Sequence, residues 1–447
     1  MPEEAVGGRS RGLYVETYGC PLNKSDSQIM IELAVSAGYE LKSSPEEADF
    51  LLLNTCAVRR DSEERAMKRI AELRRLGKKL VVAGCLASAR PFTLLSLAPE
   101  MTLLSTGSVH RIVEALESPP GTAILEHSSI KRDLLPSYAI CPSRDELIAV
   151  VPLCEGCLCS CSFCITTVAR PNLLSRRPER VVERIAELVE RGFYEIQLTG
   201  QDLAVYGYDL AGKPLLPNLI EEILCKVGGD YKLRVGMMTP GWFLKIMDEL
   251  LELYSDPRIY LFFHLPLESG DDRVLRVMKR NYSVDEYVEM VREIRRKFED
   301  AYIATDIIVG HPGEDEEAFE NTMRVVRELE FDRVHVAQYT PRPLTLSARL
   351  KGVPDHVKKE RSRRLSKLCE EVGYKRHARY IGRLVEGVVV ERGRGLVARA
   401  RNYASIVLPS GSASLGEKVK VLIERVTFFD LRGKVIERSP TQKATNT

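Results

Sequence analysis

Three cysteines, Cys157, Cys161 and Cys164, lie close together, with three residues between the first two and two residues between the last two. They follow an apolar run from residue 147 to residue 153. Thiolates at this spacing can hold three irons of a cubane iron-sulfur cluster from one loop, which leaves the fourth iron without a protein ligand. An iron with a free position can bind a small molecule and pass it an electron, so the spacing predicts cofactor chemistry rather than a closed electron carrier.

A zinc site and unrelated buried thiols are the alternatives for this loop. Zinc sites usually take four ligands from two separated pairs of residues, and this loop contains no such separation. Cys154 and Cys159 add two more thiols whose role the spacing does not assign. Phe163, just before the last cysteine, is either a core side chain or an aromatic wall beside a bound adenine.

Three further cysteines each follow a predicted strand in the first part of the chain. Apolar runs at 12–18, 48–54, 79–83 and 101–105 alternate with helical patterns at 25–37, 62–76 and 109–116, which predicts a small parallel α/β domain in residues 1–120. The carboxyl ends of parallel strands share one edge of a sheet. We therefore expect Cys20, Cys56 and Cys85 to meet there and to hold a second cluster with one open iron.

Three unrelated buried cysteines are the alternative for this second set, because cysteine is often buried. Asn23, Asp26 and Asn54 flank the set. They could line a cluster, but we expect them to cap helices and turns, which is the commoner use of these residue types.

The composition is that of an ordinary globular protein of about three domains, with 447 residues, 44% hydrophobic and 29% charged. The net charge is only +2, so contact with nucleic acid would depend on local clusters of positive charge. Eleven cysteines and no recognisable signal peptide predict a reducing compartment, which we take to be the cytoplasm. No apolar run reaches the roughly 18 residues that a membrane span requires, so we expect no membrane contact.

A second α/β alternation begins after a linker predicted at residues 121–146, which follows Pro119 and Pro120 and contains Pro136 and Pro142. Six strand-like runs separated by helical patterns predict a partial (β/α)6 barrel over residues 147–378, with its site at the carboxyl ends of the strands. The cysteine loop follows the first of these runs. The predicted strands are 147–153, 195–199, 232–237, 260–265, 302–309 and 333–338, and two of the predicted helices are 179–190 and 316–328.

Polar and glycine-containing motifs follow successive predicted strands of this barrel. A ligand with an amino-acid end, a ribose and a base needs carboxylate or amide acceptors and close approach to the backbone, and these motifs could supply both. With Phe163, the candidate ligand-binding residues are Thr199, Gly200, Gln201, Asp202, Glu268, Ser269, Arg280 and Asp306.

The last part of the chain, residues 382–440, is predicted to be a small β-barrel of a kind often used on nucleic acid. Five short strands are expected at 387–390, 396–401, 405–408, 418–423 and 426–429. Residues 382–436 contain ten lysines and arginines against five acidic residues, which indicates RNA binding. Tyr403, Phe428 and Phe429 are candidate stacking groups, and a solvated surface around an ordinary core is the alternative.

Taken together, these motifs resemble the radical S-adenosylmethionine methylthiotransferases over nearly all of residues 12–436. The order of the motifs is specific to that family, which ends in a TRAM-like domain. They are Thr-Tyr-Gly-Cys-Pro-Leu-Asn at 17–23, Asn-Thr-Cys at 54–56, Gly-Cys at 84–85, the three-cysteine loop with Ala169-Arg170 and Ser175-Arg176, Leu-Thr-Gly-Gln-Asp at 198–202, His264-Leu265-Pro266, the run at 274–280, Thr-Asp-Ile-Ile-Val-Gly at 305–310 and Pro341-Arg342-Pro343.

The resemblance implies two 4Fe-4S clusters and S-adenosylmethionine as cofactors. Cys157, Cys161 and Cys164 would hold the cluster that cleaves S-adenosylmethionine to a radical, and Cys20, Cys56 and Cys85 an auxiliary cluster that takes part in sulfur delivery. One S-adenosylmethionine would methylate a sulfur at the auxiliary cluster, and the radical from another would abstract hydrogen from C2 of an adenine, a bond that no base can deprotonate. The implied partners are tRNA, an electron donor and a sulfur source.

Gly-Cys-Leu-x-x-Cys-Ser-Phe-Cys at 156–164, Leu-Arg-Val-Gly-Met at 233–237 and Ala-Thr-Asp-Ile-Ile at 304–308 look most like the archaeal and eukaryotic branch of the family. That branch modifies N6-threonylcarbamoyladenosine beside the anticodon. The branches acting on N6-isopentenyladenosine in tRNA and on a ribosomal-protein aspartate are the alternatives, and the basic final domain argues against the protein substrate.

The sequence departs from the family pattern at four positions, Cys159, Glu268, His311 and Leu344, where relatives usually have glycine, glutamine, phenylalanine and glycine. Two of them, Glu268 and His311, put the contacts to S-adenosylmethionine in doubt. Two hypotheses from other classes also stay open: an RNA-binding iron-sulfur protein without catalysis, and a radical enzyme for a small molecule with a merely structural barrel.

Overall fold

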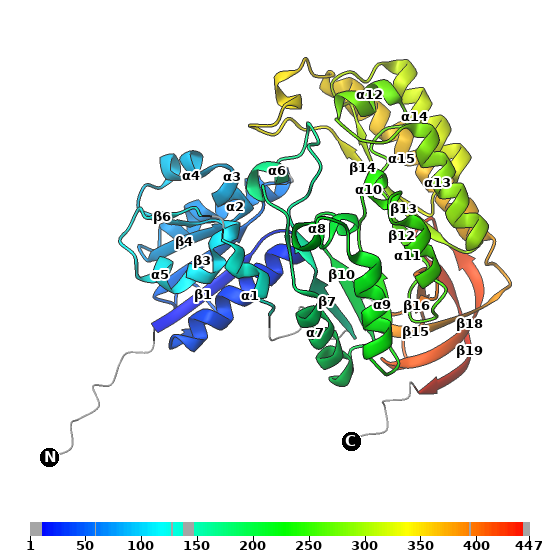
Figure 1. Cartoon of the computed structure of the whole chain (residues 1–447), viewed down its shortest axis with the longest axis horizontal. Coiled ribbons are helices and arrows are strands. Elements are labelled where there is room, and N and C mark those ends of the chain that lie inside the picture. The colour runs from blue at the N-terminus through cyan, green and yellow to red at the C-terminus, as the bar shows by residue number, and fades with distance from the viewer. Residues whose placement is uncertain (1–10, 59, 127, 137–146, 393–394, 441–447) are drawn as a thin grey trace. The chain divides into compact units, whose positions relative to one another are not determined.

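The computed structural model describes residues 11–58, 60–126, 128–136, 147–392 and 395–440 (Figure 1). The chain divides into two compact units. Unit 1 comprises residues up to 140 together with residues 165–174, and unit 2 comprises residues 141–164 and everything after 174.

Unit 1 is built on a six-stranded parallel sheet in the order β2-β1-β3-β4-β5-β6. Helices cover both of its faces, which explains why the central strands are almost wholly apolar. Leu51 and Leu53 point to the core beneath α2, whereas Leu52 points to the core beneath α1. The strands are β1 (Arg11–Thr17), β2 (Tyr39–Leu41), β3 (Phe50–Thr55), β4 (Lys79–Gly84), β5 (Thr102–Leu104) and β6 (Ala123–Ile124). The helices are α1 (Pro21–Ser36), α2 (Arg60–Arg74), α3 (Cys85–Ala89), α4 (Pro91–Leu97) and α5 (Ile112–Glu117), with 3-10 turns η1 (Thr106–Arg111) and η2 (Ser129–Asp133).

The expected alternation of strands and helices in unit 1 is confirmed, with a few short elements added. β2, α3 and α4 were not predicted, because three to seven residues carry too little periodicity to stand out. The helix expected at 109–116 begins as a 3-10 turn and becomes α-helical only at Ile112. β6 lies within the stretch expected to be a linker. Its two residues add a strand to the sheet by pairing with β5.

The first part of unit 2 contains the six predicted parallel strands in two sheets, ordered β11-β10-β7 and β12-β13-β14. Single bridges from Leu233 to Ile259 and from Met237 to His264 join β11 to β12, so the strands follow one another in chain order, as a partial (β/α)6 barrel requires. The strands are β7 (Ile148–Pro152), β10 (Glu195–Thr199), β11 (Lys232–Val235), β12 (Phe262–His264), β13 (Tyr302–Val309) and β14 (Arg333–Gln338).

Helices of unit 2 alternate with these strands (Figure 1). Their buried sides carry the apolar residues expected of amphipathic helices, as in the two predicted helices, α7 and α14. In chain order from β7 to the final barrel, the helices are α6 (Thr166–Ala169, counted in unit 1), α7 (Pro178–Glu190), α8 (Tyr208–Ala211), α9 (Leu216–Lys226), α10 (Pro240–Phe243), α11 (Met247–Leu253), α12 (Asp272–Val277), α13 (Val284–Lys297), α14 (Glu316–Leu329) and α15 (Asp355–Ala378).

Unit 2 ends in a closed five-stranded barrel in the order β15-β16-β17-β19-β18. The prediction of a small barrel is confirmed, but the strand expected at 426–429 is wrong. Residues 417–426 form one continuous strand in which a bulge at Glu424 disturbs the alternation, Thr427 to Asp430 make a turn, and a further strand follows. The strands are β15 (Leu384–Arg392), β16 (Leu396–Ala400), β17 (Ser405–Leu408), β18 (Glu417–Val426) and β19 (Leu431–Pro440).

The final barrel shares a hydrophobic core with the amino-terminal ends of the preceding strands. Tyr260, Phe262 and Tyr302 belong to the same buried cluster as barrel residues such as Val389 and Ile406. The barrel is thus fixed to the six-stranded part of unit 2. Among the described residues, no helix combines the length and apolar character that crossing a membrane would require.

Candidate functional site

The first half of the cysteine loop is held by residues that follow β10. The backbone N–H of Gly156 donates to Oε1 of Gln201 at 2.8 Å, and the Cys154 thiol donates to the backbone oxygen of Asp202 at 3.5 Å. Gly200 has no room for a side chain, because a Cβ there would stand 2.8 Å from the Cys154 sulfur. Cys154 is therefore a buried packing residue of the loop.

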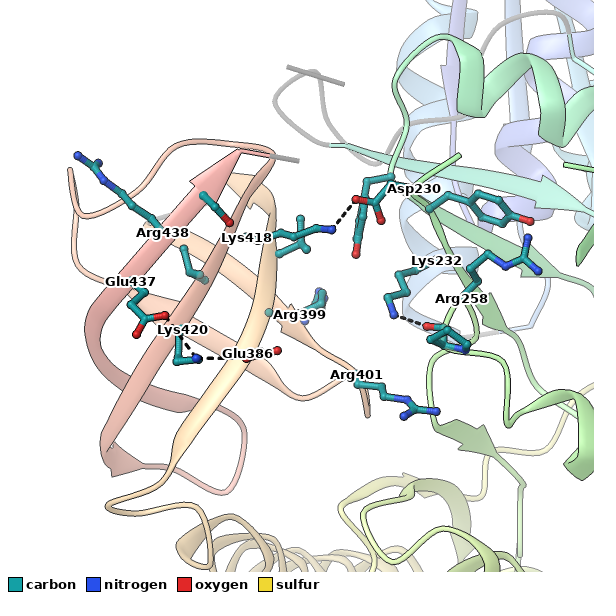
Figure 2. A pocket seen from close by; sticks show the side chains of 17 residues that line it. Asp230, Lys232, Arg258, Glu386, Arg399, Arg401, Lys418, Lys420, Glu437 and Arg438 are labelled. Atoms are coloured by element: carbon teal, nitrogen blue, oxygen red, sulfur yellow. Dashed lines mark hydrogen bonds and ion pairs between the residues drawn. The ribbon is translucent and has the colours of Figure 1, made fainter. Parts of the chain in front are cut away.

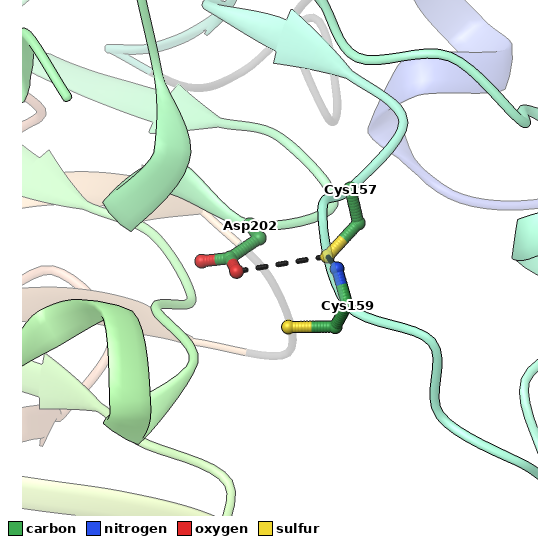
Figure 3. A group of neighbouring side chains, drawn as sticks. All are labelled: Cys157, Cys159 and Asp202. Atoms are coloured by element: carbon green, nitrogen blue, oxygen red, sulfur yellow. Dashed lines mark hydrogen bonds between the residues drawn. The ribbon is translucent and has the colours of Figure 1, made fainter. Parts of the chain in front are cut away.

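Asp202 joins the ends of two strands to the first cysteine of the motif (Figure 3). Its Oδ1 accepts hydrogen bonds from the backbone N–H of Ala204 at 3.1 Å and of Thr239 at 2.9 Å, and its Oδ2 lies 3.6 Å from the Cys157 sulfur. Burial raises the pKa of Asp202, although both N–H groups lower it. A buried carboxyl fixed by the backbone thus faces a candidate iron ligand, with the Cys159 sulfur also close by.

The second half of the loop is pinned through Ser162, a residue that the sequence analysis missed. Its N–H donates to the Met278 carbonyl at 3.0 Å and its hydroxyl to the Val277 carbonyl at 2.7 Å. Its hydroxyl also lies 2.7 Å from that of Ser347, which in turn lies 2.8 Å from Nε2 of His311. These contacts join residues up to 185 positions apart in the chain, so no local pattern could have revealed them.

His311 is fully buried, and burial lowers its pKa to about 4. Its Nδ1 donates to the Pro312 carbonyl at 2.9 Å. The ring lies 6.0 Å from that of Phe163 and 5.0 Å from that of Tyr339. The histidine that stands where relatives usually have phenylalanine is therefore an uncharged ring in an aromatic cluster behind the loop, and Phe163 packs there with Ile308.

The middle cysteine faces a cation. Nη1 of Arg280 donates to the Cys161 sulfur at 3.2 Å, and its Nη2 donates to the Pro266 carbonyl at 3.3 Å. Glu268 lies near both Arg280 and Cys161, with a left-handed backbone (φ 64°), and burial raises its pKa to about 8. A protonated glutamic acid offers a carbonyl acceptor and one O–H donor, so Glu268 can reproduce the acceptor and one of the two donors of glutamine.

Of the other predicted residues, Thr199 ends β10 beside the loop, and its carbonyl accepts from the N–H of Leu153 at 2.8 Å. Ser269 is buried next to Glu268. Asp306 lies deeper, on β13, and its carboxylate accepts hydrogen bonds from Nε2 of His264 at 3.0 Å and Nδ1 of His335 at 2.9 Å. Burial would raise the pKa of Asp306, but the two imidazoles hold it well below its usual range.

The two histidines that flank Asp306 are further residues that the sequence analysis missed. Asp306 is paired with His335 in the register of β13 and β14, and His264 ends the neighbouring strand β12. The available signal was one histidine or aspartate in each of three strands, but only the register places the three side chains together.

The loop fits the cluster that the spacing predicts, judged by the chemistry of its donors. The Cys159 side chain and burial raise the pKa of Cys161. The protein alone therefore favours the neutral thiol of Cys161, and a bound cation would deprotonate it. Donors to the sulfurs are already in place, since the N–H of Cys159 donates to Cys157 at 3.3 Å and Arg280 donates to Cys161.

In unit 1 the structure brings Cys20, Cys56 and Cys85 together at the carboxyl ends of β1, β3 and β4. Burial raises the pKa of Cys85 to about 11, and the thiols of Cys20 and Cys56 are close enough to contribute. Three converging thiols suit an iron-sulfur cluster. Cys20 is the exposed member of the three.

The expectation that Asn23, Asp26 and Asn54 act as caps is wrong. The cap of α1 is Cys20, without a side-chain hydrogen bond, and Nδ2 of Asn23 instead donates to the Tyr18 and Thr55 carbonyls at 3.0 and 2.9 Å. Asn23 also accepts from the Cys85 thiol at 3.5 Å and from Arg170 at 3.1 Å. These residues form a buried polar network around the second cysteine set.

Arg170 is the cation of that network and comes from the segment 165–174. Its Nη2 lies 2.5 Å from Oδ2 of Asp26, while Nζ of Lys131 lies 2.6 Å from Oδ1. Arg170 lowers the pKa of Cys85, against the larger effect of burial. A positive side chain is thus available to the second cysteine set, as Arg280 is to the first.

The candidate RNA-stacking groups differ in what they can do. Tyr403 is wrong as a base-stacking residue, because it packs against Tyr260 and Phe262 and its hydroxyl donates to Glu195 at 3.0 Å. Phe429 is half exposed, but the guanidinium of Arg333 covers it at 3.5 Å from the ring centroid. Phe428 is exposed and stays a candidate.

Three family models match the chain, in the order of its domains. They are described as uncharacterized protein family UPF0004 (residues 12–106), the radical SAM superfamily (residues 151–326) and the TRAM domain (residues 382–436). The first match contains the cysteine set of unit 1, and the second contains the cysteine loop.

Relatives from archaea and animals match nearly the whole chain. Pyrococcus abyssi and Methanocaldococcus jannaschii each have a protein named probable threonylcarbamoyladenosine tRNA methylthiotransferase. They are 37% and 38% identical to this chain, cover 95% of it and are themselves covered over 99% and 97% of their lengths. The Danio rerio protein named threonylcarbamoyladenosine tRNA methylthiotransferase is 30% identical over 100% of this chain and 82% of its own length.

Solved structures support the fold alone. A radical S-adenosylmethionine methyltransferase, TsrM from Kitasatospora setae with cobalamin and a [4Fe-4S] cluster bound, aligns with a TM-score of 0.57 at 14% identity, over 76% of this chain and 77% of that one. A cobalamin-dependent S-adenosylmethionine radical enzyme, OxsB, aligns with a TM-score of 0.54 at 10% identity, over 82% of this chain and 56% of that one.

Proposed function

The chain belongs to the radical S-adenosylmethionine methylthiotransferases, and from this membership we propose that it adds a methylthio group to C2 of N6-threonylcarbamoyladenosine in tRNA. The observation that carries the proposal is that archaeal and animal relatives bearing this substrate in their names match the chain from end to end. The isopentenyladenosine and ribosomal-protein alternatives are not favoured, since none of these relatives is named for them.

The family implies a 4Fe-4S cluster and S-adenosylmethionine, and we assign the cluster to Cys157, Cys161 and Cys164. When bound there, the cluster supplies the electron that cleaves S-adenosylmethionine to a radical. Arg280 would keep positive charge beside Cys161, and Asp202 and Gln201 would hold the loop at the ends of the strands. We keep Phe163, Thr199, Gly200, Glu268, Ser269 and Asp306 as the proposed surroundings of S-adenosylmethionine.

We assign a second 4Fe-4S cluster to Cys20, Cys56 and Cys85. It would hold the sulfur that is transferred to the adenine. The convergence of the three thiols and the cation of Arg170 beside Cys85 support this role. Asn23 and Asp26, which lie around the set, are both buried. Asn23 donates to the Thr55 carbonyl and Asp26 is paired with Arg170, so they would hold the cysteines in place rather than react.

An electron donor and a sulfur source must come from outside the chain, because the described side chains supply neither. The basic final barrel supports tRNA as the partner. We propose the cytoplasm as the location, since the fold carries thiols that require reducing conditions and the substrate is tRNA.

The test is a reaction of the anaerobically reconstituted protein with S-adenosylmethionine, a chemical reductant and tRNA carrying N6-threonylcarbamoyladenosine. Nucleosides from digested tRNA are then weighed by mass spectrometry. We expect the 2-methylthio derivative of N6-threonylcarbamoyladenosine together with 5'-deoxyadenosine.

Matched substrates separate the alternatives. The same tRNA with unmodified adenosine, and a tRNA with N6-isopentenyladenosine, should give little or no methylthio product. A product on the isopentenyl tRNA in preference to the threonylcarbamoyl tRNA would refute the assignment of the substrate, and 5'-deoxyadenosine without any methylthio nucleoside would refute the assignment of the reaction.

A further inference from the structure

A cavity of about 570 Å³ lies between the final barrel and the start of the central strands (Figure 2). One wall comes from the residues that precede or begin β10 and β11, such as Tyr194 and Lys232, and the other from β15, β16, β18 and β19. Both walls belong to unit 2, and the shared core that holds the barrel to the strands fixes them to each other. The cavity is thus a built feature of one rigid part of the molecule.

The lining of this cavity is strongly basic. Seven cationic side chains line it against three acidic ones. The cations are Lys232, Arg258, Arg399, Arg401, Lys418, Lys420 and Arg438, and the acids are Asp230, Glu386 and Glu437.

Some of these cations are neutralised by neighbours. Nζ of Lys420 lies 3.5 Å from a carboxylate oxygen of Glu386 and 3.3 Å from one of Glu437, and Nη2 of Arg399 lies 3.2 Å from Glu391. Arg258 is paired with Asp256 at 2.8 Å. These three cations are therefore already matched by carboxylates.

Lys232, Arg401 and Lys418 carry that remaining charge. Among the residues that the structure describes, Asp230 is the one carboxylate paired with any of the three, at 2.7 Å from Nζ of Lys418. The amino group of Lys232 donates to the backbone carbonyl of Pro257, and Arg401 donates to that of Ser255 at 3.4 Å. Burial lowers the pKa of Lys232 to about 8, and the charges of Arg401 and Lys418 contribute to that lowering while Asp230 and Asp256 oppose it, so the three cations repel one another.

An anion with several acceptor oxygens would remove this repulsion. A phosphate group accepts hydrogen bonds from more than one cation at once, and each such charge-assisted bond is stronger than a neutral one. A carboxylate already in the wall, Asp230, leaves two of the three cations unmatched. The charge and the size of the cavity therefore suit a phosphodiester.

The position of the cavity restricts where such a phosphate can come from. Lys232 begins β11, whereas the cysteine loop follows the carboxyl end of β7 in the same parallel sheet. Five residues of strand span about 15 Å, so the cavity and the loop lie at opposite ends of the strands. An adenine at the loop and a phosphate in the cavity must belong to different nucleotides of a folded RNA.

We propose that the cavity bounded by Lys232, Arg401 and Lys418 binds a backbone phosphate of the tRNA, at the end of the strands opposite to the reacting base. The inference rests on the proposed function for the identity of the RNA. It adds a second point of contact, which would fix the orientation of the tRNA on unit 2 without reading its sequence.

The test measures the reactivity of individual lysines in the full-length reconstituted protein. Trace acetylation followed by mass spectrometry reports the accessibility of each amino group with and without a probe. The probes are an unmodified tRNA transcript and inorganic phosphate. We expect the transcript to reduce labelling of Lys232 and Lys418 several-fold and to leave Lys297, which lies on α13 outside the cavity, unchanged.

Two variants give an independent measure of the same contact. Lys232→Gln and Arg401→Gln should each weaken binding of the transcript by roughly tenfold and lower the slope of affinity against salt concentration by about 0.7 to 0.9. Lys297→Gln makes the same change in net charge on another surface and should leave both quantities unchanged.

Protection by inorganic phosphate alone would overturn the proposal in favour of a small free anion. Absence of protection by either probe would also overturn it and leave the cavity as a wall of ion pairs. Neither result touches the proposed function, because methylthiolation is measured separately on the tRNA nucleosides. If that reaction fails while the transcript still protects Lys232, the proposed methylthiolation is refuted and the proposed phosphate site is not.

Discussion

The two cysteine sets are built in opposite ways. Cys157, Cys161 and Cys164 come from one loop, which hydrogen bonds with Gln201, Arg280 and the Val277 carbonyl hold in place. Cys20, Cys56 and Cys85 come from three separate strand ends, and only the order of the parallel sheet brings them together. The first set depends on the conformation of a short segment, and the second depends on the fold of unit 1.

Their surroundings differ in the same sense. The second half of the loop is supported by neutral groups, the hydroxyls of Ser162 and Ser347 and the uncharged ring of His311, although Asp202 and Arg280 face two of its cysteines. The second set is supported by a buried carboxylate, Asp26, between the two cations Lys131 and Arg170. A hydroxyl network orients at little electrostatic cost, whereas a buried ion pair destabilises strongly if one partner is lost.

Alanine substitutions should separate the two sets completely. Cys157→Ala removes a ligand of the proposed radical cluster, so we expect no detectable 5'-deoxyadenosine and no methylthio product. Cys56→Ala should leave 5'-deoxyadenosine measurable and abolish the methylthio nucleoside. Both products are measured by mass spectrometry on reconstituted protein, and equal loss of 5'-deoxyadenosine in the two variants would break the comparison.

Iron content should divide in half between the sets. Two cubane clusters give about eight irons per chain, and removing all three cysteines of either set should leave about four. Iron and acid-labile sulfide are counted after anaerobic reconstitution. About four irons in the unsubstituted protein would show that it holds one cluster and would refute the proposed second cluster.

Spacing predicted the first cysteine set because all its ligands lie in one loop, and the strand pattern predicted the second because parallel strands share an edge. Neither signal reaches side chains that meet only through long-range register. His264 and His335 stand in separate strands, and only the fold brings both to Asp306. Ser162 and Ser347 are likewise far apart in the sequence and meet only in the fold.

The errors in the final barrel have a similar cause. The bulge at Glu424 breaks the alternation that marks a strand, so the pattern divides β18 near that residue and does not predict β19. Composition indicates RNA binding but does not show which aromatic side chains are exposed. It therefore does not reveal that Tyr403 packs against Phe262. Element types were predictable from local pattern, and contacts across the chain were not.

Glycine substitutions should show that the second set is the more sensitive to backbone change. Gly84, just before Cys85, has φ of 92°, and a Cβ there would stand 2.1 Å from Oδ1 of Asn54 and 2.6 Å from the Thr55 carbonyl. Gly84→Ala should cost about 3 kcal/mol or more. Gly200→Ala meets the Cys154 side chain instead, which can shift, and should cost about 1 to 3 kcal/mol.

Denaturant unfolding of the protein without added iron measures both glycine variants. Gly192→Ala shares the positive φ but has open space around the added Cβ, so it separates backbone strain from collision. A larger loss for Gly200→Ala than for Gly84→Ala would reverse the comparison.

The smallest effect concerns acid stability at the loop. Burial holds the pKa of His311 at about 4 in the folded protein, below the unfolded value of about 6.5. The stabilisation from keeping this ring neutral is present above pH 6.5 and is lost as the pH falls towards 4, by about 2 kcal/mol at pH 5. His311→Phe should remove this loss.

Unfolding free energies of the two proteins at pH 7 and pH 5 measure that difference. Glu314, whose pKa is raised to about 7, is present in both proteins, so its contribution cancels. An equal fall in stability for both proteins would show that other groups, and not His311, set the acid sensitivity of the loop.

The segment 165–174 delays the completion of unit 1 during protein synthesis. Ile165 and Ala169 complete its hydrophobic core and Arg170 pairs with the buried Asp26, yet all three are translated after the first strand of unit 2. A nascent chain grows by about 5 to 20 residues per second. The amino-terminal sheet must therefore wait on the ribosome for its last residues, and the chain cannot release a finished first domain before the cysteine loop of the second has been made.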